Sequence, residues 1–175
     1  TPTTIPGATP GVTPEANSAA NLIGNWTRGC IVTTLDAGSN PIGWATNDLS
    51  VSGNMATETV TTYSSSDCTT ANKKLEKKTI ATFTTGNSST VSGYNYIDFT
   101  IVQITITPFQ SSTTTSYNTG SYTSGCGNAI GYCGITNWTT GGSTDVTGIN
   151  HCQSGCSHAA SGSTKSNSSG KAGWK

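Results

Sequence analysis

Residues 94–107 constrain the fold of this chain more than any other stretch, because their apolar side chains follow a period of two. Such alternation is typical of a β-strand, in which successive side chains point to opposite faces. The alternation changes phase once, which predicts a β-bulge near residue 101. Pro108 is expected to end the strand. The apolar residues are Ile97, Phe99 and Ile101 before the change of phase, and Val102, Ile104 and Ile106 after it.

Further strand-like segments surround this one and are separated by clusters of Gly, Asn, Asp and Pro, which favour turns. About eight short strands in total predict an all-β fold, either an antiparallel barrel or a β-sandwich. The other segments expected to form strands are residues 22–34, 43–51, 55–63, 74–85, 116–123 and 129–140.

The composition supports an all-β fold and excludes several functional classes. The chain has 34 Thr and 23 Ser among 175 residues, and only 9% of its residues are charged. Thr favours strands over helices, so long helices are not expected. Eight basic and eight acidic residues leave no basic excess for nucleic acid. No apolar stretch is long enough for a transmembrane segment.

Six cysteines indicate an oxidising compartment. An even number of cysteines in a chain rich in Thr, Asn and Gly predicts three disulfides in a secreted protein, located outside the cell or on its outer surface. No signal peptide is visible, as expected of a processed chain. Fifteen pairings are open on the cysteine count alone. The cysteines are Cys30, Cys68, Cys126, Cys133, Cys152 and Cys156.

Four Asn-x-Ser/Thr sequons are candidate glycosylation sites in a source whose secretory pathway glycosylates proteins. They are Asn25, Asn87, Asn137 and Asn167.

The chain divides into a Thr/Pro-rich tail at residues 1–20, a β-domain at residues 21–156 and a Ser/Gly/Lys-rich tail at residues 157–175. Prolines recur at every fourth position of the first tail. One interpretation is a flexible linker. The other is a strand with one blank edge, because in an extended chain all four missing N–H groups fall on the same side. Such a strand suits addition to a neighbouring subunit, with the apolar side chains buried. The assembly residues are Pro2, Ile5, Pro6, Pro10, Val12 and Pro14.

Two motifs point to a family. Gly24-Asn25-Trp26 opens the first predicted strand, and Tyr132-Cys133-Gly134-Ile135-Thr136-Asn137-Trp138 precedes Asp145-Val146-Thr147-Gly148 and Cys152. These motifs resemble those of lipocalin-like β-barrels among poorly characterised bacterial secreted and surface (lipo)proteins.

The resemblance implies a lipocalin-like barrel with Gly24, Trp26 and Trp138 as its signature residues. It also implies the pairs Cys30–Cys68 and Cys133–Cys152, which leaves Cys126–Cys156. Cys126 and Cys156 are additional to the family pattern, and Ile135 stands where the pattern has Tyr.

No pattern for catalysis or a cofactor stands out, so a non-enzymatic protein without catalytic residues, metal or cofactor is expected. His151, Cys152, Cys156 and His158 are residue types that bind zinc, but a disulfide-stapled loop explains the cysteines better. The carboxylates fall mostly in turns, and Asp67 and Asp145 are expected to form Asx-type turns.

Residues 73–78 hold four of the eight basic residues. This run indicates either a solvated edge strand whose lysines prevent aggregation or a basic patch for anionic polymers, and the edge strand is favoured.

Three functions fit these observations. The favoured one is a self-assembling structural subunit of a cell-surface fibre or sheath, whose partners are copies of itself. The alternatives are a lipocalin-like binder of a small apolar ligand and an adhesin that recognises cell-surface glycans.

Overall fold

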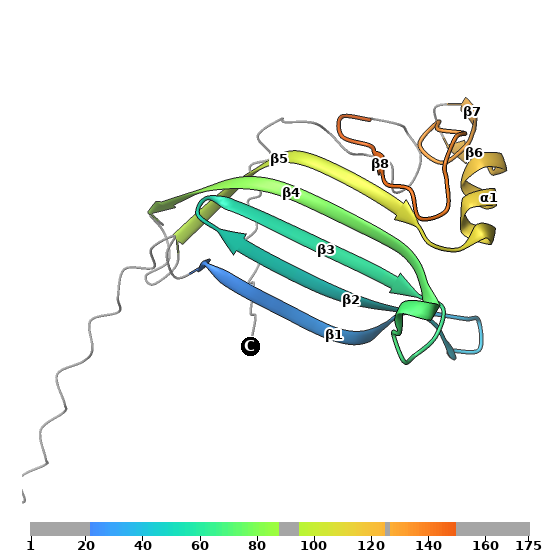
Figure 1. Ribbon diagram of the computed structural model, residues 1–175, viewed down its shortest axis with the longest axis horizontal. Helices are drawn as coiled ribbons and strands as arrows, with labels where there is room; N and C mark the ends of the chain where they lie inside the picture. The colour runs from blue at the N-terminus through green and yellow to red at the C-terminus, as the bar shows by residue number, and fades with distance from the viewer. Residues whose placement is uncertain (1–21, 88–94, 125–126, 150–175) are drawn as a thin grey trace, which may run out of the picture.

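The computed structural model describes residues 22–87, 95–124 and 127–149. Its main feature is an antiparallel six-stranded sheet in which the first five strands pair in chain order (Figure 1). The strands, in their order across the sheet, are β1 (Gly24–Leu35), β2 (Pro41–Ser52), β3 (Met55–Tyr63), β4 (Lys73–Asn87), β5 (Asn95–Pro108) and β8 (Thr144–Asp145).

The remaining elements are short and include a two-stranded sheet. Figure 1 shows most of them gathered beyond the end of β5. They are the 3-10 turn η2 (Thr70–Asn72), the helix α1 (Ser111–Thr119) and the paired strands β6 (Ser121–Ser124) and β7 (Gly127–Ile130). The predicted antiparallel, all-β fold is confirmed. The six-stranded sheet is open, with β1 at one edge and β8 at the other, so a closed eight-stranded barrel stays a prediction.

The five strands expected between residues 22 and 107 are confirmed as β1 to β5, with ends within two residues of those predicted. The bulge expected near residue 101 is confirmed as well. Ile80 pairs with Gln103 and Ala81 pairs with Ile101, so Val102 is the extra residue. The bulge places Ile101 and Ile104 on the same face of the sheet despite their odd spacing.

The two later strand predictions are confirmed only in part, since residues 121–123 lie in β6 and residues 129–130 in β7. Residues 116–119 lie in α1, where Thr113 and Thr114 are buried and the Thr114 hydroxyl donates to the Gln110 carbonyl at 3.1 Å. Packing therefore overrides the low helix propensity of Thr and Ser. The strand expected at 129–140 ends at Ile130, because a turn with positive φ at Gly131 and Cys133 follows.

One face of the sheet, called the inner face, carries two apolar clusters. The first cluster lies where the segment after α1 packs on β5, and the second lies between β1 and β4. The first cluster comprises Ile104, Ile106, Trp138 and Val146, with Leu75, Ile101, Tyr117, Tyr132, Ile135 and Ile149 against it. The second comprises Val51, Ala56 and Phe83, with Leu22, Trp26 and Leu49 against it.

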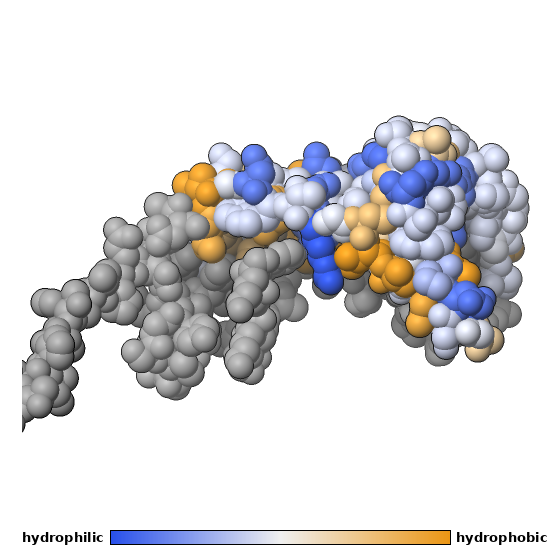
Figure 2. Space-filling model, turned by 90° about the horizontal axis from the view of Figure 1, so that it is seen from below, coloured by the Kyte–Doolittle hydropathy of each residue, from blue (hydrophilic) through white to orange (hydrophobic). Residues whose placement is uncertain are grey.

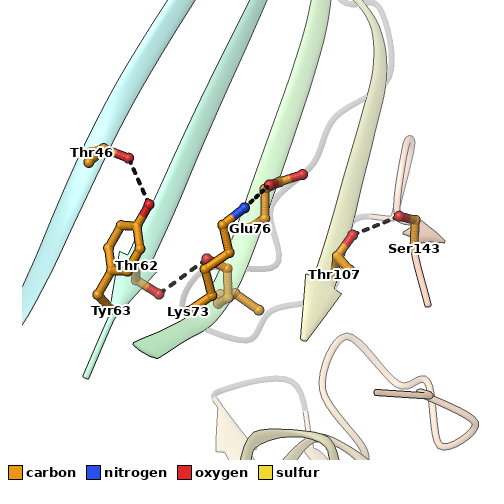
Figure 3. A network of polar contacts seen from close by, with 8 residues as sticks. Thr46, Thr62, Tyr63, Lys73, Glu76, Thr107 and Ser143 are labelled. Carbon is orange, nitrogen blue, oxygen red and sulfur yellow. Dashed lines mark hydrogen bonds and ion pairs between the residues drawn. The ribbon is translucent and has the colours of Figure 1, made fainter. Parts of the chain in front are cut away.

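The lysine-rich strand is central, so the favoured prediction that it forms an edge is wrong. β4 pairs with β3 on one side and β5 on the other. Lys73 forms an ion pair with Glu76 at 3.4 Å (Figure 3) and lies over the Phe109 ring, 5.0 Å from its centroid. The long aliphatic stems of lysine allow this placement, since only the ammonium group must stay solvated.

The Cys30–Cys68 disulfide is confirmed, and it joins the middle of β1 to the loop between β3 and β4. Cys133 is also disulfide-bonded. The predicted pairs Cys133–Cys152 and Cys126–Cys156 involve cysteines outside the described residues. Within the described ranges, no helix has the length and apolar character to cross a membrane.

Candidate functional site

The outer edge of β1 is open in the part of the chain that the structure describes. This strand of twelve residues pairs with β2 along one side, and no described residue pairs with its other side. An open strand edge presents N–H and C=O groups that a further strand can bind. The outer edge of β1 is therefore a candidate site for strand addition.

The side chains around this edge are apolar or uncharged, with Arg28 as the one charged residue of β1. Figure 2 views the molecule from the β1 side and shows hydrophobic surface toward both ends of the edge, with hydrophilic surface between. Exposed apolar residues in this region include Val32 at 47% and Leu35 at 55% of their full accessible area. Aside from Arg28, the edge has little charge to repel another strand.

The Cys30–Cys68 disulfide holds this edge in place. Cys68 lies in the loop at residues 64–72, where the Asn72 side-chain amide donates to the Asp67 carboxylate at 2.9 Å. This bond from Asn72 lowers the pKa of Asp67 below its ordinary value. β1 carries register irregularities between Arg28 and Ile31 and after Val32. The disulfide and the bonded loop therefore fix an irregular strand that its neighbour holds on one side only.

The opposite edge of the sheet is partly covered. β8 pairs with β5 at two positions, and the backbone N–H of Val146 donates to the Ile104 carbonyl at 2.9 Å. The N–H of Gly141 donates to the Pro108 carbonyl at 2.7 Å. The edge of β5 is thus occupied from Ile104 to Pro108, in contrast to the edge of β1.

A second candidate site is a polar centre on the inner face. The Asn47 side-chain amide donates to Glu58 Oε1 at 2.8 Å, while Asn47 Oδ1 is buried and has no hydrogen-bond partner among the described residues. Asn47 pairs across the strands with Arg28 on one side and Val60 on the other, and Lys77 follows beyond Val60. The centre therefore combines a carboxylate, an amide and two cations on a face that is otherwise largely apolar.

Gly24 and Trp26 belong to the second apolar cluster. Gly24 has φ of 149°, and a Cβ atom there would lie 3.4 Å from the Trp26 ring. Trp138 lies in the first cluster, is 2% exposed and donates its indole N–H to the Ile135 carbonyl at 3.0 Å. The three signature residues are therefore divided between two clusters.

The carboxylates expected in turns do form Asx-type turns. Asp67 Oδ1 accepts the N–H of Thr69 at 3.4 Å, and Asp145 Oδ1 accepts that of Thr147 at 2.8 Å. Asp36 does the same with the N–H of Gly38 at 2.8 Å. Hydrogen bonds from Asn40 hold the pKa of Asp36 below its ordinary value. These carboxylates are structural in the observed fold.

The structure describes only some of the other predicted site residues. Asn25 and Asn137 are exposed, as sequons must be for modification, and Asn87 ends β4. Among the described residues, no group of three or more His, Cys, Asp or Glu side chains is placed to hold a metal. The residues that lie outside the described ranges are Asn167, the assembly residues Pro2, Ile5, Pro6, Pro10, Val12 and Pro14, and the zinc-type cluster His151, Cys152, Cys156 and His158.

No protein-family model matches the chain, and no curated protein matches it.

Proposed function

We propose that this protein is a non-enzymatic, extracellular structural subunit that assembles with copies of itself by adding a strand to β1. The observation that carries the proposal is the open outer edge of this twelve-residue strand. Backbone hydrogen bonds along such an edge provide affinity without needing a particular side-chain chemistry. The Cys30–Cys68 disulfide supports the extracellular location, since structural disulfides persist in oxidising compartments.

Residues 1–14 of a neighbouring copy are the proposed added strand. Fourteen extended residues span roughly 46 Å, and the twelve residues of β1 span roughly 40 Å, so the two lengths are compatible. The prolines at positions 2, 6, 10 and 14 leave one edge of the tail with its N–H groups intact. The other edge lacks these donors, so a tail bound to β1 discourages the pairing of yet another strand.

Deletion of residues 1–14 tests the proposal. The purified full chain is expected to form large assemblies, and the shortened chain a folded monomer, as measured by sedimentation and circular dichroism. Deletion of residues 157–175 is the control, because it removes the other tail of the chain and is expected to leave assembly intact.

A synthetic peptide of residues 1–14 sharpens the test. It is expected to bind the shortened chain and to protect amides of β1 from hydrogen exchange. A peptide with Asn in place of Ile5 and Val12 is the matched control and is expected to bind more weakly. Assembly that survives deletion of residues 1–14 would falsify the proposal.

The inner face favours a second candidate function, in which the protein binds a small apolar ligand that has one polar group. The Asn47–Glu58 pair lies beside the second apolar cluster, since Glu58 pairs across the strands with Leu49. Asn47 Oδ1 is a buried acceptor with no partner in the described part of the chain, which favours a donor group on such a ligand. Native mass spectrometry of the purified protein would detect a retained molecule, and Glu58→Gln is expected to weaken its binding. A protein that carries no retained molecule would count against this function.

A further inference from the structure

We propose that residues 141–147 form an edge guard on β5, which closes the Ile104–Pro108 stretch of this edge to strand addition and so directs assembly toward β1. The inference rests on the proposed function, because it concerns which of the two sheet edges takes part in assembly.

The backbone of the edge guard occupies the outer side of β5 without a gap from Ile104 to Pro108. Val146 N–H donates to the Ile104 carbonyl at 2.9 Å, and Thr144 pairs with Ile106. Gly141 N–H donates to the Pro108 carbonyl at 2.7 Å. Pro108 has no N–H of its own, so it offers an incoming strand no donor at this end of the edge.

A side chain completes the cover. The Ile104 N–H, which also points to the outer edge, donates to the Thr147 hydroxyl oxygen at 2.7 Å. A neighbouring strand would supply a carbonyl at this point, and the hydroxyl takes its place. The ladder between β5 and the guard therefore ends at Thr147, with the N–H and the C=O of Ile104 both bonded.

The Thr147 hydroxyl is itself held in position. It donates to Asp145 Oδ1 at 2.5 Å, and the Thr147 N–H donates to the same oxygen at 2.8 Å. The Gln103 side-chain amide donates to Asp145 Oδ2 at 3.0 Å, which ties the guard to β5 from the side. These bonds give the hydroxyl a fixed orientation with its lone pair toward Ile104.

Apolar packing anchors the guard to the inner face. Val146 is fully buried in the first apolar cluster with Ile104, Ile106 and Trp138. The Ser143 and Thr107 hydroxyls form a hydrogen bond of 2.7 Å near the end of β5 (Figure 3). An incoming strand would have to displace both the backbone bonds and this buried side chain.

With Ile104–Pro108 covered, β1 is the longer unpaired edge: its outer side is open over twelve residues, whereas on the outer side of β5 only residues 95–103 pair with no described residue. A subunit that donates one tail and accepts one tail forms an unbranched, head-to-tail chain, because its interface is heterologous. A second open edge on β5 would allow lateral pairing of sheets, which leads to uncontrolled aggregation.

The test removes the Thr147 hydroxyl from a chain that lacks residues 1–14. Thr147→Val keeps the shape of the side chain and removes the acceptor for the Ile104 N–H. We expect exchange of the Ile104 amide to become at least about tenfold faster, since a lost hydrogen bond is worth roughly that factor. We also expect this double variant to self-associate, while the chain with the deletion alone stays monomeric.

Two controls accompany the variant. Thr144→Val changes a threonine of the same segment and is expected to leave both the Ile104 exchange rate and the monomer unchanged. Thr147→Ser keeps the hydroxyl and is expected to behave as the native residue, which shows that the chain tolerates substitution at this position.

The guard is overturned if Ile104 exchange in the Thr147→Val variant matches that of the parent. It is equally overturned if Ile104 exchange accelerates and the variant remains monomeric. Assembly of the chain with the deletion alone counts against the proposed function instead, and Ile104 exchange still decides whether the guard holds the edge.

Discussion

Gly24 shows how one missing side chain shapes the start of β1. Its φ of 149° lies in a region that side-chain-bearing residues rarely adopt, and the Trp26 ring packs beside it. The Gly-x-Trp motif therefore has a local physical reason in this fold, because glycine adopts this backbone conformation without strain. Trp26 in turn covers the second apolar cluster.

Gly24→Ala is expected to lower the free energy of unfolding by about 1–3 kcal/mol, because the new methyl group forces strain into the backbone. Gly29→Ala is the control, since a Cβ at Gly29 would meet no atom within 4 Å and Gly29 has no positive φ. Urea titrations of the two variants and the native chain measure the difference. Equal losses in both variants would contradict the role given to Gly24.

Asp145 makes stability depend on pH. Hydrogen bonds from the Gln103 amide and from Thr147 lower the pKa of Asp145 in the folded chain below its ordinary value of 3.8. The charged form is therefore favoured by folding, and its stabilisation is present above pH 3.8 and is lost as the pH falls through the lower folded-state pKa.

We expect the free energy of unfolding to fall on acidification below about pH 4, with Asp36 and Asp67 contributing in the same direction. Asp145→Asn is expected to reduce the slope of this decline, because residue 145 then no longer titrates. Urea midpoints of both proteins between pH 2 and pH 7 measure the slope, and an unchanged slope would refute the assignment to Asp145.

A covalent bond links β1 to the loop between β3 and β4. The Cys30–Cys68 disulfide closes a loop with a sequence separation of 38 residues. In the chain-entropy model a loop of this length stabilises the fold by about 4 kcal/mol. It also ties the edge strand to the loop between β3 and β4.

The double variant Cys30→Ser/Cys68→Ser is expected to lose about 2–4 kcal/mol of unfolding free energy. Amides of β1 should exchange faster than those of β3, because β3 keeps a hydrogen-bonded neighbour on each side. Hydrogen exchange of the native and variant chains measures both. Uniform acceleration across the sheet would show that the disulfide does not act on β1 in particular.

The sequence was sufficient to predict the strands whose apolar residues alternate, including the bulge at Val102. It was insufficient for α1, because Thr and Ser favour other structures until packing buries Thr113 and Thr114. The lysine run of β4 led to the wrong prediction of an edge strand, because the composition of one segment does not show where its strand lies in the sheet. Strand order depends on pairings along the whole chain.

The inner polar centre did leave a signal in the sequence. Asn47 interrupts an apolar series of the same parity, Ala45, Leu49 and Val51, which places it on the inner face of β2. Its partner Glu58 could not be identified in this way, because the pairing depends on the register between β2 and β3. Long-range register is thus the main information that the sequence alone did not provide.

At the scale of the whole molecule, the two edges of the sheet differ. The outer side of β1 meets no strand among the described residues, while β5 is covered from Ile104 to Pro108. A fully open edge on β1, a partly guarded edge on β5 and a tail of suitable length are the properties expected of a subunit that grows by strand addition.

Hydrogen exchange of β1 in assembled protein and in the chain without residues 1–14 tests strand addition most directly. Along β1, alternate amides face outward, and these are expected to be protected in the assembled protein and to exchange rapidly in the shortened chain. The amides of β3 are expected to be equally protected in both. Assemblies in which the outward amides of β1 exchange as fast as in the shortened chain would contradict assembly through this edge.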